Sequence, residues 1–252
     1  MKKRGKQLKI RLQKPKSPIT TTYYSLRDKT LAGKDRKMSG DTIPNWAFGV
    51  STTLLQALKE RDPYTYGHSR RVARNARLLA HAAGLDEDQQ RTIEFSSLFH
   101  DLGKIGIPDS ILLKPGVLTD IEEAIMRAHP VKSVEILKPL SQIPFFRSTL
   151  PGVKHHHERM DGAGYPDGIK GENIPVTARI LLIADTFDAM TTTRPYRKGF
   201  DFDFAYKELK QFSGRQFDPQ LVQIFIKAHP KWGALESEIT EEFVSTYYRR
   251  AA

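Results

Sequence analysis

The feature that most constrains the fold is a series of hydrophobic patterns with helical spacing, which begins at Ile43 and continues almost to the C-terminus. Within the second segment, for example, Val72, Ala76 and Leu79 fall on one stripe. The segments that we expect to be helical are 44–60, 68–84, 87–101, 119–128, 132–139, 176–192, 203–213 and 218–228. Strand signals are weak, and the best of them, the apolar run 180–183, fits a buried helix equally well. The sequence therefore predicts an all-α fold.

Local signals support two of these helix starts. Thr119 and Glu122 have the spacing of a capping box. Asp218 followed by Pro219 places an N-cap residue before a proline in the first helical turn. Both signals predict where a helix begins independently of the hydrophobic pattern.

Two stretches rich in Gly and Pro, 103–116 and 161–175, interrupt the helical pattern. Their composition indicates turns and close backbone approaches. Each begins just after a cluster of His and acidic residues, and active sites are usually assembled from such loops. We therefore expect the functional site beside these two loops.

The basic character of the chain lies in its N-terminal part. Residues 1–45 carry 13 Lys and Arg against 3 Asp, a balance of +10 out of the net +11 of the whole chain. This distribution predicts a basic, poorly structured arm over 1–44, a folded domain over 45–230 and a C-terminal extension over 231–252. The arm could contact anionic lipid, nucleic acid or an acidic partner, or could be a solvated linker, and we favour the linker.

Composition excludes several classes of protein. No window approaches about 18 uninterrupted apolar residues, and no apolar run follows the basic start, so we expect neither a transmembrane segment nor a secretory signal. The chain has no cysteine, which excludes disulfides and thiolate metal sites and fits a cytoplasmic protein. Any metal ion must therefore be held by nitrogen and oxygen atoms.

Histidine and acidic residues occur together in ways that indicate a metal site. His100 and Asp101 close a helix whose other face is apolar. Asp185 lies inside an apolar helical segment, where a buried carboxylate is costly unless it is paired or bound to a cation. Histidines are the natural co-ligands, and the chain has eight of them: His68, His81, His100, His129, His155, His156, His157 and His229.

A series of motifs surrounds these residues. In order they are RDPYTYGHSRRV at 61–72, FHDLGKIGIPDSILLKPGVLT at 99–119, AHP at 128–130, HHERMDGAGYPDGIKGENIP at 156–175, ARILLIADTFDAMTTTRPYR at 178–197 and QFDP at 216–219. In this order they resemble the HD-GYP domains, a metal-dependent phosphodiesterase branch of the HD superfamily that acts on cyclic dinucleotides. The resemblance covers residues from about 45 to 230 and implies that this part is a catalytic HD-domain helical bundle.

The resemblance implies a binuclear metal centre. Carried over position by position, the metal ligands would be His68, His100, Asp101, His129, His156, His157 and Asp185, with Asp101 as the bridging carboxylate. Imidazoles and carboxylates together suit two divalent ions, with iron or manganese favoured and zinc, nickel, cobalt or magnesium as alternatives. Of the other histidines, His81 and His229 are expected at the surface. His155 is expected to be exposed or to lie behind the ligands, and to be replaceable.

Tyr64 departs from the pattern of some members of the family. Those members hold a third metal ion with a glutamate four residues before the first ligand histidine, and Tyr64 occupies that position here. Because a phenol is a poor substitute for a carboxylate at neutral pH, we expect two metal ions and a linear dinucleotide product. Two smaller departures, Met160 where a Trp is common and Ser133 where a Gly is common, remove no ligand.

The resemblance also implies the reaction. The expected activity is hydrolysis of cyclic di-GMP, and of the mixed cyclic GMP-AMP dinucleotide, to a linear product such as pGpG, with further breakdown to GMP left open. Two metal ions would activate the attacking water, and Asp101 and Lys104 would be the catalytic residues. The substrate-binding residues would be Asp62, Lys104, Tyr165, Arg194 and Arg197.

Two other functions stay open. A general HD-type phosphohydrolase that acts on mononucleotides would share the metal site, although the GYP loop and the RPYR segment at 194–197 favour a ligand with two bases. A non-catalytic cyclic-dinucleotide sensor would be indicated by missing ligands, and none of the expected ligands is missing. The further partners that we expect are a diguanylate cyclase or another signalling protein and a second copy of the chain, but no specific nucleic acid.

Overall fold

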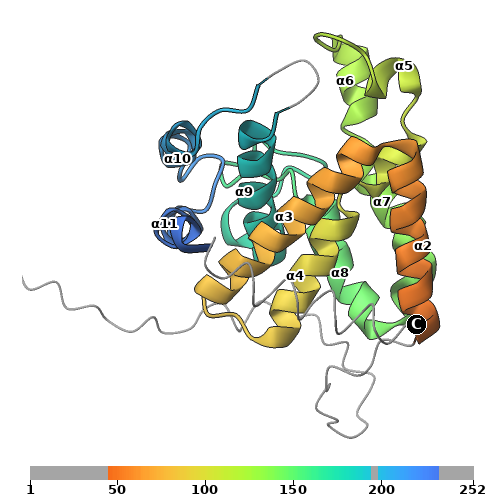
Figure 1. Cartoon of the computed structure of the whole chain (residues 1–252), viewed down its shortest axis with the longest axis horizontal. Coiled ribbons are helices and arrows are strands. Elements are labelled where there is room, and N and C mark those ends of the chain that lie inside the picture. Colours follow the sequence, from red (N-terminus) through yellow and green to blue (C-terminus); the bar gives the residue numbers. More distant parts are fainter. Residues whose placement is uncertain (1–44, 194–197, 233–252) are drawn as a thin grey trace, which may run out of the picture. The chain divides into compact units, whose positions relative to one another are not determined.

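The described part of the chain is a bundle of helices without a β-sheet (Figure 1). The computed structural model of the protein describes residues 45–193 and 198–232. The elements are α2 (Asn45–Arg61), α3 (Pro63–Ala82), α4 (Glu87–Phe99), η1 (Leu102–Gly106), α5 (Asp109–Leu112), α6 (Asp120–Met126), α7 (His129–Leu137), η2 (Lys138–Gln142), α8 (Pro144–His155), η3 (Gly171–Asn173), α9 (Val176–Thr191), α10 (Phe202–Gln211), α11 (Pro219–Ala228) and η4 (His229–Lys231). The predicted all-α class is confirmed, and the apolar run 180–183 lies inside α9.

The two predicted helix starts are confirmed. Thr119 and Glu122 form the capping box of α6. At the start of α11, the carboxylate of Asp218 accepts hydrogen bonds from the backbone N–H groups of Gln220 and Leu221. Each cap satisfies backbone donors that a helix N-terminus leaves unpaired.

Two helices begin earlier than predicted, each at a proline or just before one. α3 begins at Pro63 rather than at 68, because the carboxylate of Asp62 accepts hydrogen bonds from the first N–H groups of the helix. α7 begins at His129 rather than at 132, with Pro130 in its first turn. A proline is tolerated there because its missing N–H would have no partner within the helix.

α8 is absent from the predicted helices. Pro144, Pro151 and Gly152 give the segment the composition of a loop. The segment is nevertheless helical because it carries a buried face. Phe145 and Phe146 pack edge-on against a phenylalanine of α4, and burial of one such side chain contributes about 1.5–3 kcal/mol. Tertiary packing therefore overrides local propensity in this segment.

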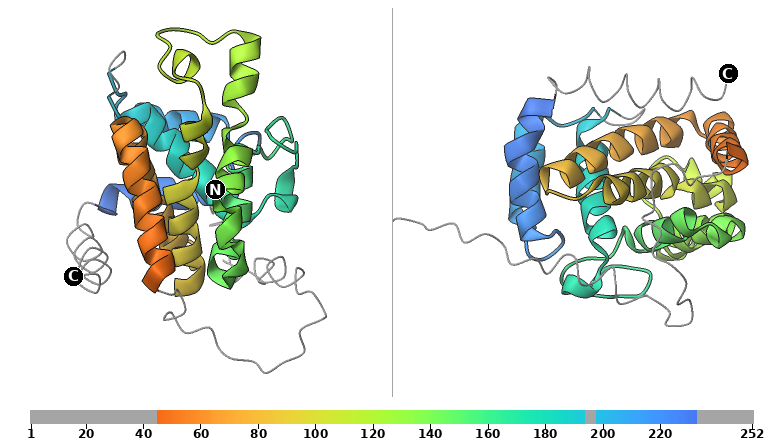
Figure 2. Two further views of the ribbon diagram at one scale, coloured as in Figure 1. Left: turned by 90° about the vertical axis from the view of Figure 1, so that its right-hand side faces the viewer. Right: turned by 90° about the horizontal axis from the view of Figure 1, so that it is seen from below.

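Two hydrophobic clusters stabilise the bundle. One joins α3, α9, α10 and α11 and contains Phe187, Phe225 and Trp232. The other joins α2, α4, α7 and α8 and contains Phe99 and Phe146. Figures 1 and 2 show α10 and α11 at the opposite end of the bundle from α2, with α3, α4 and α9 between them. These central helices are therefore fixed by packing from both ends.

Some predictions fall on residues that the structure does not describe. The basic arm over 1–44, Arg194 and Arg197, and residues 233–252 of the predicted extension all lie outside the described residues. Trp232 is buried in the first cluster, so packing continues just beyond the predicted boundary at 230. Among the helices that are described, none is long and apolar enough to cross a membrane.

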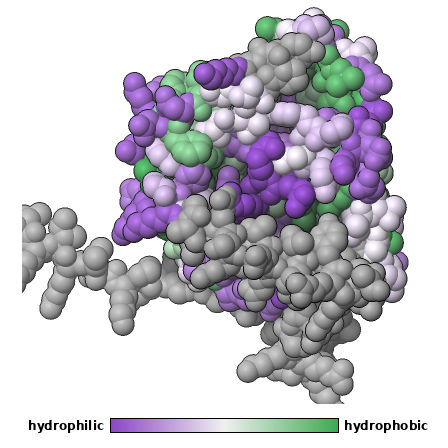
Figure 3. Space-filling view, viewed as in Figure 1, coloured by the Kyte–Doolittle hydropathy of each residue, from purple (hydrophilic) through white to green (hydrophobic). Residues whose placement is uncertain are grey.

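The α5–α6 hairpin contributes little to either cluster. α6 has no buried residue. The exposed apolar side chains of the hairpin are Leu113, Val117, Ile121 and Ile125, and Figure 3 shows apolar surface gathered over this part of the molecule, at the upper right. Arg61 ties the base of the hairpin to α2, because its Nη2 donates to the backbone oxygen of Ile107 at 3.0 Å and to Asp109 Oδ1 at 2.7 Å.

η1 lies directly against α7 because Gly103 has no side chain. A Cβ atom at this position would lie 2.1 Å from the backbone oxygen of His129 and 2.6 Å from the backbone nitrogen of Ser133. The Ser133 hydroxyl fills the junction, where it accepts from the N–H of Gly103 at 2.7 Å and donates to the backbone oxygen of His100 at 2.8 Å. The departure at Ser133 therefore ties the end of α4 to α7.

We expect Gly103→Ala to lower the free energy of unfolding by about 1–3 kcal/mol, because the added methyl group forces η1 away from α7. Urea denaturation followed by circular dichroism measures the change. Gly106→Ala in the same 3₁₀-helix is the matched control, since its Cβ would meet only the flexible side chain of Lys132, at 3.4 Å. Equal stability of the two variants would contradict the close approach.

Candidate metal centre

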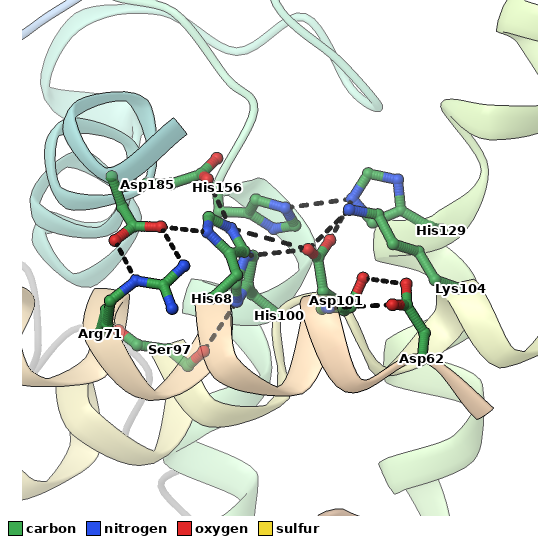
Figure 4. A network of polar contacts seen from close by, with 12 residues as sticks. Asp62, His68, Arg71, Ser97, His100, Asp101, Lys104, His129, His156 and Asp185 are labelled. Atoms are coloured by element: carbon green, nitrogen blue, oxygen red, sulfur yellow. Dashed lines mark hydrogen bonds and ion pairs between the residues drawn. The ribbon is translucent and has the colours of Figure 1, made fainter. Parts of the chain in front are cut away.

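Polar side chains from separate helices converge at one place in the centre of the bundle (Figure 4). The converging residues labelled in the figure are His68, His100, Asp101, Lys104, His129, His156 and Asp185. All of them are buried except Lys104 and Asp185, which are only slightly exposed. Every one of them belongs to the set predicted from the sequence.

The ligand-type atoms fall into two groups. In each group, three side chains offer atoms that lie within 4.8 Å of one another. The groups are His68, His100 and Asp101, and His129, His156 and His157. Asp185 adjoins the first group, with its Oδ1 3.0 Å from Nε2 of His68. Two adjacent groups of nitrogen and oxygen donors are suited to hold two divalent ions.

Asp101, a member of the first group, also faces the second group. Its Oδ2 is 3.4 Å from Nε2 of His100 and 3.9 Å from Nε2 of His68, while its Oδ1 is 3.2 Å from Nε2 of His129. One carboxylate oxygen thus faces each group. This is the arrangement that a bridging ligand requires.

Three of the imidazoles are oriented by the ends of helices. In each, Nδ1 donates a hydrogen bond to the backbone oxygen three residues earlier, which leaves Nε2 free to face the centre. The pairs are His100 with Ser97 at 2.7 Å, His129 with Met126 at 2.8 Å and His156 with Val153 at 2.8 Å. These oxygens belong to the last turns of α4, α6 and α8, where carbonyl groups have no partner within the helix.

His68 is oriented by a side chain instead, because it lies inside α3. Its Nδ1 donates to Oδ2 of Asp188 at 2.7 Å. Arg71, one turn further along α3, holds the same carboxylate through Nε at 2.7 Å and Nη2 at 3.0 Å. Asp188 was not among the predicted site residues. Its signal in the sequence is its position three residues after Asp185 in the same apolar helix, which places both acids on one face.

The protonation states suit metal ligation in the second group. Burial lowers the pKa of His129 to about 4 and that of His157 to about 3, so both imidazoles are neutral at neutral pH. At His68 burial also lowers the pKa, but hydrogen bonds to Asp185 and Asp188 outweigh it and raise the pKa to about 9. The carboxylates of Asp185 and Asp188 therefore favour a positive charge at the position of His68.

Lys104 lies beside the carboxylate of Asp101. Its Nζ is 2.6 Å from Oδ2 of Asp101. Burial lowers the pKa of Lys104, but the charge of Asp101 outweighs it and raises the pKa above the ordinary value. Burial raises the pKa of Asp101, yet the neighbouring His100 and Lys104 hold it well below its usual range. The ammonium group and the carboxylate are therefore both charged at neutral pH.

Asp62 and Tyr64 lie at the start of α3, next to this pair. The Asp62 carboxylate caps the helix, and its charge also helps to raise the pKa of Lys104. The Tyr64 ring is stacked on that of His68, with centroids 6.4 Å apart and an interplanar angle of 3°. An aromatic ring thus occupies the position at which the resemblance implies a third-metal glutamate in some members of the family.

The loop after α8 carries Tyr165 against the second group. Its ring stacks on that of His157, with centroids 4.7 Å apart. The loop backbone is held by Glu158, whose Oε1 accepts from the N–H groups of Asp167 at 2.7 Å and Gly168 at 3.0 Å. Glu158 was not predicted, and only its burial next to the ligands distinguishes it.

The histidines outside the two groups have structural contacts. His155 is partly buried, with its Nε2 2.9 Å from Oδ2 of Asp167, and His81 is exposed as expected. The expectation for His229 is wrong. It is half-buried among aromatic rings, with Nδ1 2.7 Å from the hydroxyl of Tyr206, because η4 folds back over the first hydrophobic cluster and packs Trp232 there.

The donor set fits metal ions. Nε2 of His100 is buried and has no hydrogen-bond partner. Nε2 of His129 lies 3.2 Å from Nε2 of His156. Because both neutral rings donate through Nδ1, each Nε2 carries a lone pair that faces the other. A cation bound by both nitrogens would relieve this repulsion. A metal ion with nitrogen ligands would bind the unpartnered Nε2 of His100 and the facing lone pairs of His129 and His156.

Comparison with known proteins assigns the chain to a family. The family described as HD domain matches residues 52–221. Among curated proteins, the cyclic di-GMP phosphodiesterase response regulator RpfG of Xanthomonas campestris pv. campestris is 43% identical over 174 residues, which cover 69% of this chain and 46% of that protein. The cyclic di-GMP phosphodiesterase of Thermotoga maritima is 39% identical over 79% of this chain and 52% of its own length.

A relative with another named substrate matches the same part of the chain. The 3'3'-cGAMP-specific phosphodiesterase 2 of Vibrio cholerae is 37% identical over 75% of this chain and 36% of that protein. The chain spans about half the length of the curated relatives it matches, or less.

Two solved structures show the same fold. They are the cyclic GMP-AMP phosphodiesterase V-cGAP3 of V. cholerae, with a TM-score of 0.55 and 20% identity over 75% of this chain and 50% of that chain, and the HDG"Y"P protein Bd1817 of Bdellovibrio bacteriovorus, with a TM-score of 0.51 and 16% identity over 72% and 61%. HD-domain phosphohydrolases depend on metal ions. The family match covers most of the described bundle, and the motifs around the candidate ligands are those of the HD-GYP branch. This chain therefore belongs to the HD domain family as an HD-GYP domain.

Proposed function

We propose that the chain is a metal-dependent phosphodiesterase that hydrolyses cyclic di-GMP to linear pGpG. The observation that carries this proposal is the pair of candidate ligand groups that Asp101 faces with one carboxylate oxygen each, with the ammonium group of Lys104 alongside. Relatives named as cyclic di-GMP phosphodiesterases, at 43% and 39% identity, support the substrate. A relative named for 3'3'-cGAMP extends the proposed substrate class to mixed cyclic dinucleotides.

The residues proposed to hold two divalent ions are His68, His100, Asp101, His129, His156, His157 and Asp185. Their nitrogen and oxygen atoms favour iron or manganese, with zinc, nickel, cobalt and magnesium as alternatives. When bound, the two ions supply Lewis acidity, which lowers the pKa of an attacking water and stabilises charge on phosphate oxygens. With Tyr64 in place of a third-metal glutamate, we propose two ions and a linear product.

The chain itself supplies charge and orientation. Lys104 stays protonated, so it can donate a hydrogen bond to a phosphate oxygen as negative charge grows there. Tyr165 and Asp62 are proposed to line the substrate pocket. Arg194 and Arg197, outside the described residues, are proposed to bind a phosphate or a guanine edge through paired donors.

The direct test is hydrolysis of cyclic di-GMP by the full chain loaded with manganese, or with iron under anaerobic conditions. We expect pGpG to accumulate, as identified by chromatography and mass spectrometry, and turnover to stop on chelation and return with added metal. Intact cyclic di-GMP, in a reaction where an established hydrolase is active, would refute the proposal. Cleavage of mononucleotides alone would favour a general phosphohydrolase.

Asp101→Ala should abolish turnover and reduce bound metal below two ions per chain, because both ligand groups lose their shared carboxylate. Elemental analysis of the purified variant gives the metal content. Asp203→Ala, which removes an exposed carboxylate on α10, is the control and should retain both activity and metal. Full metal content in Asp101→Ala would exclude the bridging role.

Lys104→Met should separate charge stabilisation from metal binding. Because Lys104 is not in either ligand group, we expect the variant to keep both ions while kcat falls about a hundredfold or more, as when one charge-stabilising donor is removed. Parallel measurement of metal content and initial rate decides this. An unchanged kcat would show that Lys104 is only the ion-pair partner of Asp101.

Asp188→Ala should weaken metal binding by about 10- to 100-fold, because His68 loses the acceptor that fixes its orientation. Titration of the metal-free variant with manganese against a competing chelator measures the affinity. Asp188→Asn, which keeps an oxygen acceptor for Nδ1 of His68, should lose less. Binding as tight as in the wild-type protein would mean that packing alone orients His68.

A further inference from the structure

Tyr165 contacts a cationic residue that the predicted site does not include. Cζ of Arg127 lies 5.1 Å from the centroid of the Tyr165 ring, which is the distance of a cation–π contact. The same ring stacks on the imidazole of His157. Arg127, Tyr165 and His157 therefore form a column that ends on one of the candidate metal ligands.

Arg127 is itself held in place. Its Nε donates to Oε1 of Glu123 at 2.9 Å, across one turn of α6. Arg127 is also the C-cap residue of α6, and the chain reaches His129 two residues later. The contact with Tyr165 thus joins the turn that positions His129 to the loop that follows His157. These segments are distant in sequence, and the column links two ligands of the second group.

The backbone of the Tyr165 loop does not depend on this contact. The N–H of Tyr165 donates to the backbone oxygen of His157 at 3.3 Å, and Glu158 holds the following turn. What Arg127 adds is therefore the orientation of the ring. A tyrosine hydroxyl keeps its proton at neutral pH and can therefore donate a hydrogen bond.

We propose that Arg127 is a positioning residue, whose guanidinium holds the Tyr165 ring against His157 so that the phenolic hydroxyl donates a hydrogen bond to the substrate phosphate. The role in turnover rests on the proposed phosphodiesterase function. The contact between Arg127 and Tyr165 does not depend on that function, because the orientation of the Tyr165 ring can be measured without substrate. Arg127 is half-exposed, with 53% of its side chain accessible, and it belongs to neither candidate ligand group.

The kinetic test compares Arg127→Gln, Arg127→Lys, Tyr165→Phe and the double variant Arg127→Gln/Tyr165→Phe. We expect Arg127→Gln to lower kcat about two- to fivefold, the range of an exposed cation–π contact, with KM and metal content unchanged. Arg127→Lys, which keeps the cation, should recover most of kcat. In the Tyr165→Phe background, Arg127→Gln should have no further effect, because the two residues act through one hydroxyl.

Arg147→Gln on α8 is the matched control, since Arg147 is exposed and only bonds the backbone oxygen of Ser141. It should leave kcat unchanged. Losses that multiply in the double variant would mean that Arg127 contacts the substrate directly. A loss of metal in Arg127→Gln would mean that it supports the ligand group. Either result, or an unchanged kcat, would overturn the positioning role.

The spectroscopic test uses zinc-loaded protein with ¹³C-labelled tyrosine rings, in which the Tyr165 signal is identified by its loss in Tyr165→Phe. We expect Arg127→Gln to shift this signal, Arg127→Lys to shift it less and Arg147→Gln to leave it in place. A Tyr165 signal that does not move in Arg127→Gln would refute the contact. An inactive wild-type protein would instead refute the phosphodiesterase function, and the ring signal would still decide whether Arg127 orients Tyr165.

Discussion

The candidate site depends on one interaction that is repeated three times, the hydrogen bond from an imidazole Nδ1 to a carbonyl group in the last turn of a helix. His100, His129 and His156 each make this bond, at the ends of α4, α6 and α8. The last carbonyl groups of a helix have no partner within the helix. Here the histidines supply the missing donors, and the same bond turns Nε2 towards the centre. Folding the helix ends and orienting the ligands are therefore one event.

The same arrangement concentrates negative charge. The C-termini of three helices, each the negative end of a helix dipole, meet where Asp101 and Asp185 are also placed. Burial alone would favour protonated carboxylates, yet nearby His and Lys residues hold the pKa of both well below its usual range. Lys104 compensates part of this charge through its ion pair with Asp101. The remaining demand for positive charge is what two divalent ions would satisfy, and an anionic phosphate could then approach them.

The sequence predicts features that depend on neighbouring residues and misses features that depend on distant ones. The ligand residues belong to short motifs with fixed spacing, so the resemblance identifies them, and the capping box at Thr119 depends on its own neighbours alone. Asp188, by contrast, meets His68 across 120 positions of sequence, and nothing in its own segment names that partner. α8 was missed because its prolines are local signals, while the burial of Phe146 that outweighs them is a tertiary one. His229 was assigned to the surface for the same reason, since its aromatic neighbours Phe187 and Phe202 come from α9 and α10.

The two ligand groups differ in what holds them, and this difference suggests how the site divides its tasks. His68 is fixed by Asp188 and Arg71 on two long packed helices, so the first group is part of the rigid centre of the bundle. The second group adjoins the α6–α7 turn and the loop after α8, a non-helical segment that is held by Glu158 and by backbone hydrogen bonds such as that from Asp161 to Arg215. Rigid elements hold a charge-dense site more precisely, whereas loops can adapt to a ligand. Adjustment to the proposed dinucleotide substrate is therefore expected on the side of Tyr165, while the geometry around Asp101 stays constant.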